Sequence, residues 1–424
     1  MIYATPANQV AALKELYVGD EYLKDLVYAK NPMLALIPKD ESPQGMGGKY
    51  LPVPIIFGTP QGRSANFANA QSNQTAPQLS SFFVYRVSNY AISSITNELL
   101  EATKGDAAAF IDEAKLVVDT TVRNFANDIA HDLYSNGSGT RGQILSIATG
   151  LITLTNSADV VQFEVGMSLV AYSIAANVYT QTAGAAVGYV VSVNRSLGQV
   201  TVSTSQGGAA ATPANWVATD FIGVQGDVIF GTIALQTSFA KIAGLQAWLP
   251  SVPPSPGENF FGVDRSVDTR LYGQYQDNSN ETIEEGLIDL ASQIAREGGQ
   301  PEMAFMNFAS YAALEKSLGS KVQYVDVKHE EADIAFAGIR IHGPYGPITV
   351  IPDKNCPSQM CFMLQMEDWK LRTLNKAPHI LRYGMEGLEG LRVSNADALE
   401  IRWGLYGNLV CRAPGWSGSC KLSA

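Results

Sequence analysis

The sequence predicts an α+β fold that carries an inserted small all-β domain, and three observations lead to this prediction. One long helix with a single apolar face is predicted over Asp106–Tyr134. The stretch from Ile144 to Phe230 combines strand and turn signals and contains only five charged residues. From Lys241 onward, helical and strand patterns follow each other in runs, which is typical of α+β proteins.

Residues 1–43 are expected to form an N-terminal arm. Apolar residues recur with helical spacing, interrupted near Gly19, at Val10, Leu13, Leu16, Tyr17, Leu23, Leu26 and Val27. Pro32, Pro38 and Pro43 then favour extended chain. An arm that reaches a neighbouring molecule and an ordinary helix packed on its own domain explain this pattern equally well.

Residues 44–95 are predicted to form an extended hairpin. Tyr50–Phe57 and Phe82–Ile95 are strand-like, and two prolines confine the first strand to a sheet edge. The connection between them, 58–81, is rich in Asn, Gln, Ser and Gly, and Arg63 is its only charged residue. A connection of this length without regular structure is usually functional or disordered, and a two-stranded hairpin is marginal in water. An ordered hairpin here therefore needs a partner surface.

Residues 96–143 are predicted to hold the long helix. Asp106 fits an N-cap, and Asn136–Gly137 supplies a stop. The apolar face consists of Phe110, Ala114, Val117, Thr121, Phe125, Ile129 and Leu133. At about 1.5 Å per residue the helix would run roughly 40 Å, long enough to act as a spine for a sheet.

Residues 144–232 are predicted to form the inserted domain, as a small β-barrel or sandwich. The strand-like stretches are GLITLT, VVQFEVGMSLVAYS, AVGYVVSV and QVTVSTS. The charged residues between Ile144 and Phe230 are Asp159, Glu164, Arg195, Asp220 and Asp227. The residues do not indicate what this domain does.

Residues 233–359 and 360–424 make up the mixed remainder. Thr282 and Glu285 match a capping box, and Gly298–Gly299 ends the helix that follows. A short helix is predicted over Tyr311–Leu318. Strands are predicted over Met303–Asn307, Ile339–His342, Ile348–Ile351, Met360–Met366, Leu399–Leu405 and Leu409–Arg412.

Composition limits the classes of partner. The 424 residues carry a formal charge of −11, and charged residues make up 16%, which is low for a soluble protein. An acidic chain neutralises phosphates poorly, so enclosed nucleic acid would not be held by a basic lining. No apolar run reaches transmembrane length and no signal-peptide pattern occurs. We therefore expect no membrane partner and synthesis in the cytosol.

No catalytic, cofactor-binding or metal-binding constellation is predicted. His329-Glu330-Glu331 is not H-E-x-x-H, Gly415–Ser419 misses G-x-S-x-G by one position, and no Walker A motif occurs. The cysteines are expected to be buried free thiols, with a zinc site shared by all four as the open alternative. They are Cys356, Cys361, Cys411 and Cys420.

Six segments of the C-terminal half resemble the major capsid proteins of tailed bacteriophages. In order, they are Gly244–Pro250, Phe261–Gly273, Glu297–Asn307, Gly343–Pro357, Met363–Leu381 and Ala396–Gly415. The resemblance implies the Hong-Kong-97-type fold. It assigns an N-arm (1–43), an extended loop across an adjacent subunit (44–95), a peripheral-domain spine helix (96–143), the insertion (144–232), an axial domain (233–359) and return strands of both domains (360–424).

The resemblance also implies the function and the partners. The chain would self-assemble, without catalysis and without a cofactor, into pentamers and hexamers of an icosahedral shell around double-stranded DNA. The DNA would be enclosed without sequence-specific binding. The shell would form in the host bacterial cytoplasm and remain as the virion capsid, with a portal and separate scaffolding or decoration proteins as further partners. The subunit interface is expected to include Arg63, Asn66, Phe67, Tyr17 and Tyr22.

Two family features are not carried over. Some relatives form covalent links from a lysine in the extended loop, whereas the 58–81 connection has Arg63 and no lysine. Arginine is not a usable nucleophile at cellular pH, so non-covalent assembly is expected. Some relatives carry a cleaved N-terminal scaffold segment. This chain begins almost directly with the arm, so a scaffold is expected to be a separate protein.

Three alternatives remain open from the sequence. An encapsulin-type cellular compartment shares the fold but encloses cargo protein. A β-rich hydrolase built on residues 144–232 is the alternative from another class, and it lacks a nucleophile–base constellation. A decoration or tail protein is disfavoured by the long helix and by the α+β half.

Overall fold

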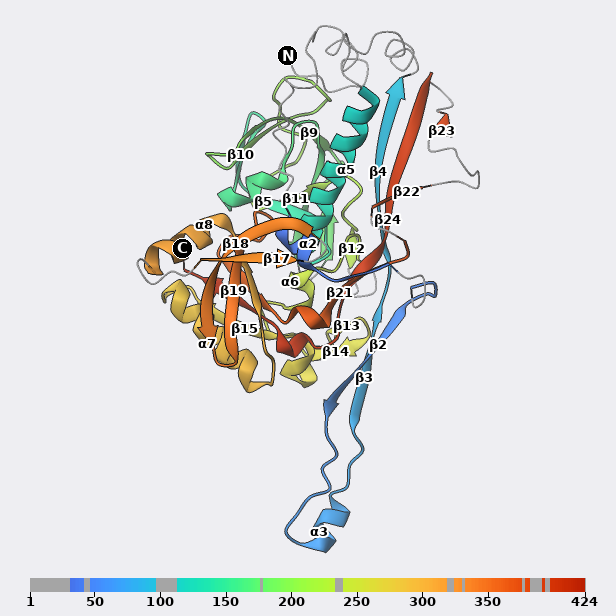
Figure 1. The fold of residues 1–424 in the computed structure, drawn as a ribbon. Helices are drawn as coiled ribbons and strands as arrows, with labels where there is room; N and C mark the ends of the chain where they lie inside the picture. The colour runs from blue at the N-terminus through green and yellow to red at the C-terminus, as the bar shows by residue number, and fades with distance from the viewer. Residues whose placement is uncertain are drawn as a thin grey trace.

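A computed structural model describes residues 31–41, 46–96, 113–175, 178–232, 239–318, 324–329, 332–375, 378–381, 391–392 and 397–423. Most of the expected N-terminal arm, the Asp106 N-cap and Phe110 lie outside these ranges. The described chain contains a projecting hairpin, two mixed α/β regions and an all-β unit (Figure 1).

The outer part of the hairpin, toward α3, projects away from all other elements in Figure 1. Its strands β2 (Leu51–Gly58) and β3 (Gln78–Val84) form a two-stranded antiparallel sheet of their own. The connection, predicted to be without regular structure, contains the short helix α3 (Phe67–Ser72) at its tip. Asn66 caps this helix, because its side chain accepts a hydrogen bond from the backbone N–H of Ala68 at 2.9 Å.

The second predicted strand, Phe82–Ile95, is in fact divided between two sheets. Its first residues belong to β3, and the rest is β4 (Val87–Thr96), which pairs antiparallel with β24 (Ala398–Cys411). β24 is one strand where two were predicted. It continues through Asn408, a residue uncommon in strands, because the buried amide of Asn408 bonds the N–H of Ala243 and the carbonyl of Tyr85. The same six-stranded sheet contains β1 (Lys39–Asp40), β21 (Trp369–Thr373), β22 (His379–Ile380) and β23 (Leu391–Arg392).

The long helix α5 (Glu113–Asp132) packs along β4 (Figure 1). Phe125, Ile129 and Leu133 of the predicted apolar face are buried. The chain leaves the helix through Gly137, whose φ of 80° is a left-handed conformation that suits glycine. Within the described residues, the predicted apolar face and stop are therefore confirmed.

The all-β unit is a closed barrel. β11 pairs with both β5 and β7, so six antiparallel strands form a ring in the order β11, β5, β6, β10, β9, β7, and β8 and β12 extend from β7. The strands are β5 (Thr140–Ala148), β6 (Leu151–Leu154), β7 (Ser168–Ala175), β8 (Val178–Gln181), β9 (Val187–Asn194), β10 (Gln199–Ser203), β11 (Phe221–Val224) and β12 (Gly231–Thr232). Where one strand was predicted over 160–173, a 3-10 helix capped by Asn156, Ser157–Gln162, precedes β7.

The last region is a seven-stranded mixed sheet with helices α7 (Ile283–Arg296) and α8 (Phe308–Leu318). The capping box of Thr282 and Glu285 is present at the start of α7, as predicted. The strand order is β15 (Gln274–Asn278), β25 (Gly418–Leu422), β20 (Met360–Leu364), β16 (Met303–Met306), β19 (Gly346–Pro352), β18 (Ala332–Gly343) and β17 (Tyr324–His329). Residues 360–424 therefore contribute strands to both sheets, β20 and β25 to this one and β21 to β24 to the sheet beside α5.

Three main apolar cores hold these regions together. The largest joins the hairpin base, α2 (Pro32–Leu36), α5, α6 (Leu245–Trp248) and the short strands β13 (Asn259–Phe260) and β14 (Val263–Asp264). The second lies between α7 and the seven-stranded sheet, and the third fills the barrel. The barrel thus has a core of its own, separate from that of the body.

Candidate assembly surface

The base of the hairpin is fixed to the body by aromatic packing. The ring of Phe82 is fully buried and lies 5.2 Å from that of Trp248 and 6.3 Å from that of Phe260, in edge-to-face geometry. The backbone N–H of Phe83 donates to the carbonyl of Phe261 at 2.8 Å. These contacts anchor one end of the hairpin, so its direction is defined in the isolated chain.

The outer part of the hairpin is exposed and almost uncharged. Arg63, Asn66 and Phe67, predicted as interface residues, all lie in or beside the tip and are exposed. Phe67, the first residue of α3, has 84% of its surface accessible. The structure gives each a distinct position: Asn66 caps α3, Phe67 is an unburied aromatic side chain, and Arg63 is the one charge of the connection. Tyr17 and Tyr22 lie outside the described residues.

An apolar cross-strand pair lies further along the hairpin and was missed from the sequence. Ile56 is directly opposite Leu79 in the β2–β3 register, and their side chains are 68% and 63% exposed. Because directly opposed side chains on one face touch, the two form a single apolar contact surface. The sequence YLPVPIIF indicates a strand whose successive side chains alternate between the two faces of the hairpin. It does not indicate which of these faces stays exposed to solvent.

Within the described chain, β2 and β3 form a ladder only with each other, so apart from single hydrogen bonds to the body both edges of this hairpin are open. Unpaired strand edges and exposed apolar side chains are unfavourable for a lone molecule and useful for an assembling one. The hairpin is therefore the strongest candidate for a contact surface between copies.

A cluster of buried charges joins the barrel to the body. Lys241 lies beside three carboxylates, with its Nζ 2.8 Å from Asp128, 3.0 Å from Asp227 and 3.7 Å from Asp132. Arg141 of β5 is ion-paired with Asp128 on the other side. The cluster connects α5, the barrel and the segment after it, and no short-range sequence pattern reveals a set so widely spaced along the chain.

The charges of this cluster depend on each other. Burial alone would raise the pKa of Asp128, but Arg141 and Lys241 outweigh it and hold that pKa well below its usual value. Burial, reinforced by the charge of Asp128, raises the pKa of Asp132 well above its usual value. Burial opposes the charge of Lys241, yet the surrounding carboxylates raise its pKa. We therefore expect the stability of this junction between barrel and body to depend on both cations.

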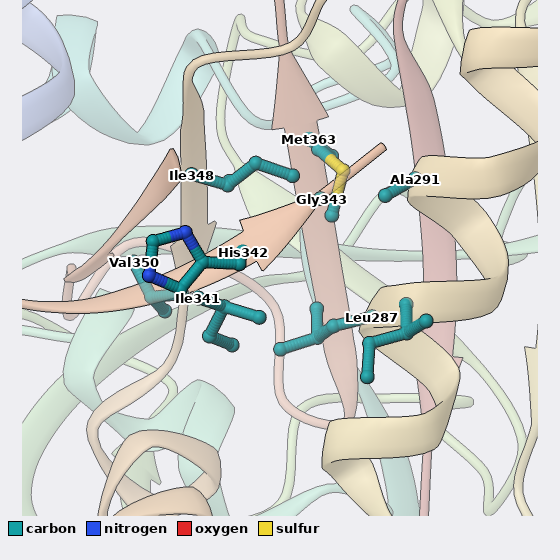
Figure 2. Close-up of a pocket in the computed structure, with 9 residues that line it drawn as sticks. Leu287, Ala291, Ile341, His342, Gly343, Ile348, Val350 and Met363 are labelled. Atoms are coloured by element: carbon teal, nitrogen blue, oxygen red, sulfur yellow. The ribbon is translucent and has the colours of Figure 1, made fainter. Parts of the chain in front are cut away.

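Two hollows in the described part of the molecule differ in character. Figure 2 shows an apolar pocket between α7 and the β18–β19 hairpin, lined by Leu287, Ile348 and Met363 among others, which leaves no room for a water molecule. A polar hollow of about 170 Å³ lies between barrel and body. Burial raises the pKa of Asp159 in its wall to about 7, and burial followed by the charge of Arg141 lowers that of His131 to about 3.

All four cysteines are buried and unpaired, which agrees with the prediction of free thiols. Within the described ranges, no group of three or more His, Cys, Asp or Glu side chains is placed to hold a metal ion. In the same residues, no helix has both the length and the apolar character needed to cross a membrane.

Comparison with known proteins gives one sequence match and several structural ones. Residues 224–383 match the family described as SU10 major capsid protein. The capsid asymmetric unit of cyanophage A-1(L) has the same fold, with a TM-score of 0.56, 13% identity, and coverage of 95% of this chain and 96% of that chain. The chain is similar to the major capsid proteins of tailed bacteriophages, in sequence over residues 224–383 and in fold over nearly its whole length.

Further comparisons agree on the fold of this capsid protein. The capsid of a native GTA particle matches with a TM-score of 0.50 and 9% identity, over 96% of this chain and 94% of that one. An encapsulin complex from Synechococcus elongatus matches with a TM-score of 0.46 and 8% identity, over 97% of this chain and 94% of that one. No curated protein matches the sequence.

The capsid protein therefore has the Hong-Kong-97-type α+β fold that the C-terminal segments suggested. It is a structural protein of the virion shell, and it functions by association with further copies of itself.

Proposed function

We propose that the capsid protein builds an icosahedral shell of pentamers and hexamers, in which the β2–β3 hairpin of each copy lies across a neighbouring copy. The observation that carries this proposal is the hairpin itself. It is anchored at its base, open at both strand edges, and bears Ile56, Phe67 and Leu79 exposed along its length. Tyr17 and Tyr22 are proposed to contribute to the same contacts between copies.

Burial of these side chains against a neighbour is the driving term. Fully burying a large apolar side chain contributes about 1.5–3 kcal/mol, which is roughly 10- to 150-fold in an association constant. Each copy in a closed shell makes the same contact, so the effect is repeated throughout the shell. With Arg63 as its only charge, the connection does not repel an identical copy strongly.

The other partners follow from the charge of the chain and the role of a shell. Double-stranded DNA is enclosed and not bound by sequence, because a net charge of −11 gives little phosphate neutralisation. A portal and separate scaffolding or decoration proteins complete the particle, which assembles without covalent cross-links in the host bacterial cytoplasm. Denaturing electrophoresis of shells should then show single chains, and a ladder of linked oligomers would contradict this.

Assembly of hairpin variants tests the proposal. Phe67→Ser and the double variant Ile56→Ser/Leu79→Ser should remain folded but lose shells in sedimentation and negative-stain images. Val217→Ser is the matched control, since Val217 is a 54% exposed apolar residue outside the hairpin. Normal shells from both hairpin variants would refute the role of the hairpin. Co-purified nucleic acid after packaging, and not cargo protein, would distinguish the virus from a compartment.

A further inference from the structure

The hairpin leaves the body at a β-bulge. Ile56 pairs with Leu79 and Gly58 with Gln78, so Phe57 is an extra residue on β2 without a partner on β3. A bulge bends a strand, increases its local twist, and leaves the extra residue outside the ladder. The direction of the outer hairpin is therefore decided at this residue.

Arg270 binds the bulge directly. Its Nη2 donates a hydrogen bond to the carbonyl of Phe57, across 213 positions in the sequence. Asp268 holds the guanidinium from the other side, with Nε at 2.9 Å from Oδ1 and Nη2 at 2.6 Å from Oδ2. Nη2 thus donates one hydrogen to the carbonyl of Phe57 and the other to Asp268, and these bonds fix the orientation of the planar guanidinium.

Asp268 is itself held in place. Its Oδ1 accepts the backbone N–H of Arg270 at 2.9 Å and caps the 3-10 turn η4 (Thr269–Leu271). This turn packs against η7 (Pro414–Trp416), and Leu271 is buried in the main core. The clamp on Phe57 is therefore built on a rigid part of the body.

The clamp acts further out than the other attachments of the hairpin. The bond from Phe83 to Phe261 lies opposite Pro52, and the buried ring of Phe82 lies opposite Val53, so both are nearer the base than Phe57. From residue 59 to residue 69 every side chain is exposed. Ten residues of extended chain beyond the bulge span about 33 Å, so a rotation of about 10° at Phe57 moves the tip by about 6 Å. This exceeds the reach of a side-chain contact, about 4.5 Å.

We propose that Arg270 and Asp268 are positioning residues for assembly, which set the angle at which the hairpin leaves the body by clamping the bulge at Phe57. The role of Arg270 and Asp268 in assembly rests on the proposed docking of the hairpin onto a neighbouring copy. Their hydrogen bonds to the bulge do not depend on that docking. Both side chains are partly exposed, and such ion pairs contribute little to overall stability. The pair therefore acts through geometry.

Spin-label distances in the unassembled full-length subunit test the clamp alone. Labels are attached at Gln71→Cys on α3 and Ser292→Cys on α7, both exposed, while the four native cysteines are buried. Arg270→Ala should broaden the distribution of distances between the two labels by about 6 Å. Arg270→Lys should show the same broadening, because a lysine ammonium lacks the planar guanidinium that bonds Phe57 and Asp268 together. Arg296→Ala, which removes a 70% exposed partner of Glu297, is the control and should change nothing. An unchanged distribution in Arg270→Ala overturns the clamp.

Assembly of the same variants tests the consequence. Arg270→Ala and Asp268→Asn should keep the circular-dichroism spectrum and melting temperature of the parent chain. They should replace uniform closed shells with shells of mixed diameter, tubes or open sheets, while Arg296→Ala gives uniform shells. If Phe67→Ser abolishes assembly but Arg270→Ala still gives uniform shells, the positioning role is wrong and the docking stands. If the distribution broadens but Phe67→Ser and Ile56→Ser/Leu79→Ser both assemble normally, the docking fails and the clamp stands.

Discussion

Replacement of Lys241 by methionine tests whether the buried charge cluster holds the barrel to the body. Lys241 is 3% exposed and contacts three carboxylates, whereas Arg141 is the second cation of the group. Methionine fills a similar volume but removes the charge. Arg141 is then the one cation beside three carboxylates. With all three carboxylates ionised, the net charge of the cluster changes from −1 to −2.

The size of the effect follows from the distances. At an effective dielectric constant of about 20, the Coulomb attraction between Lys241 and each of the three carboxylates is roughly 5 kcal/mol. The free energy needed to remove these charges from water offsets most of the total attraction. Removal of one partner from a buried pair costs about 3–5 kcal/mol, since the remaining charge stays buried and uncompensated. Arg195→Met is the control. Arg195 pairs with Glu164 at 2.9 Å with both side chains about half exposed, so the loss should be below about 1 kcal/mol.

The assay is urea unfolding of the unassembled subunit, followed by tryptophan fluorescence at two pH values. The pKa of Asp132 is higher in the folded than in the unfolded chain, so folding binds that proton more tightly and stability falls as the pH rises above about 4 toward the folded pKa. Without Lys241 this effect grows, because protonation removes an uncompensated charge. The deficit of Lys241→Met should therefore be larger at pH 8 than at pH 5. A loss no greater than that of Arg195→Met, at both pH values, would refute the argument.

Three further outcomes are expected. Phe82→Ala should cost the subunit about 3–5 kcal/mol in urea unfolding, since Phe82 is fully buried, while Phe67→Ala should stay within about 0.5 kcal/mol. Gly139→Ala should cost more than about 1 kcal/mol by the same measurement, because φ is 81° there and a Cβ would meet the backbone of Asp227. A thiol reagent at pH 8 should modify no cysteine of the native subunit and all four cysteines in urea. The reason is that all four are buried in the native subunit, and burial raises the pKa of the Cys420 thiol to about 12. Reaction of a cysteine in the native subunit would contradict this.

Local patterns predicted the elements whose ends are marked by specific residues. The capping box at Thr282 and the stop at Gly137 fixed two helix ends, because caps and left-handed glycines act over a few residues. The apolar face of α5 was legible for the same reason. Composition alone suggested that the insertion begins at 144. β5 begins at Thr140, since Arg141, a charged residue, belongs to the strand through its pair with Asp128.

Features set by distant residues were not predictable. Asn408 looks like a strand break until the carbonyl of Tyr85 and the N–H of Ala243 satisfy its amide. The exposed pair of Ile56 and Leu79 requires knowledge of which hairpin face the body covers. Arg270 carries no local signal at all, because its acceptor lies 213 positions away. Of the five interface residues predicted, three are in the exposed hairpin and remain to be tested in assembled shells.

The way the barrel is attached has a consequence for its evolution and its engineering. The chain enters the barrel beside Gly139 and leaves its closed ring of six strands beside Asp227, and a Cβ on Gly139 would touch the backbone of Asp227. On the body side, the N–H of Lys241 donates to the carbonyl of Gly137, so the two stubs are already held together. A module whose ends meet can be shortened, exchanged or replaced by a foreign domain without moving a strand of the shell-forming body.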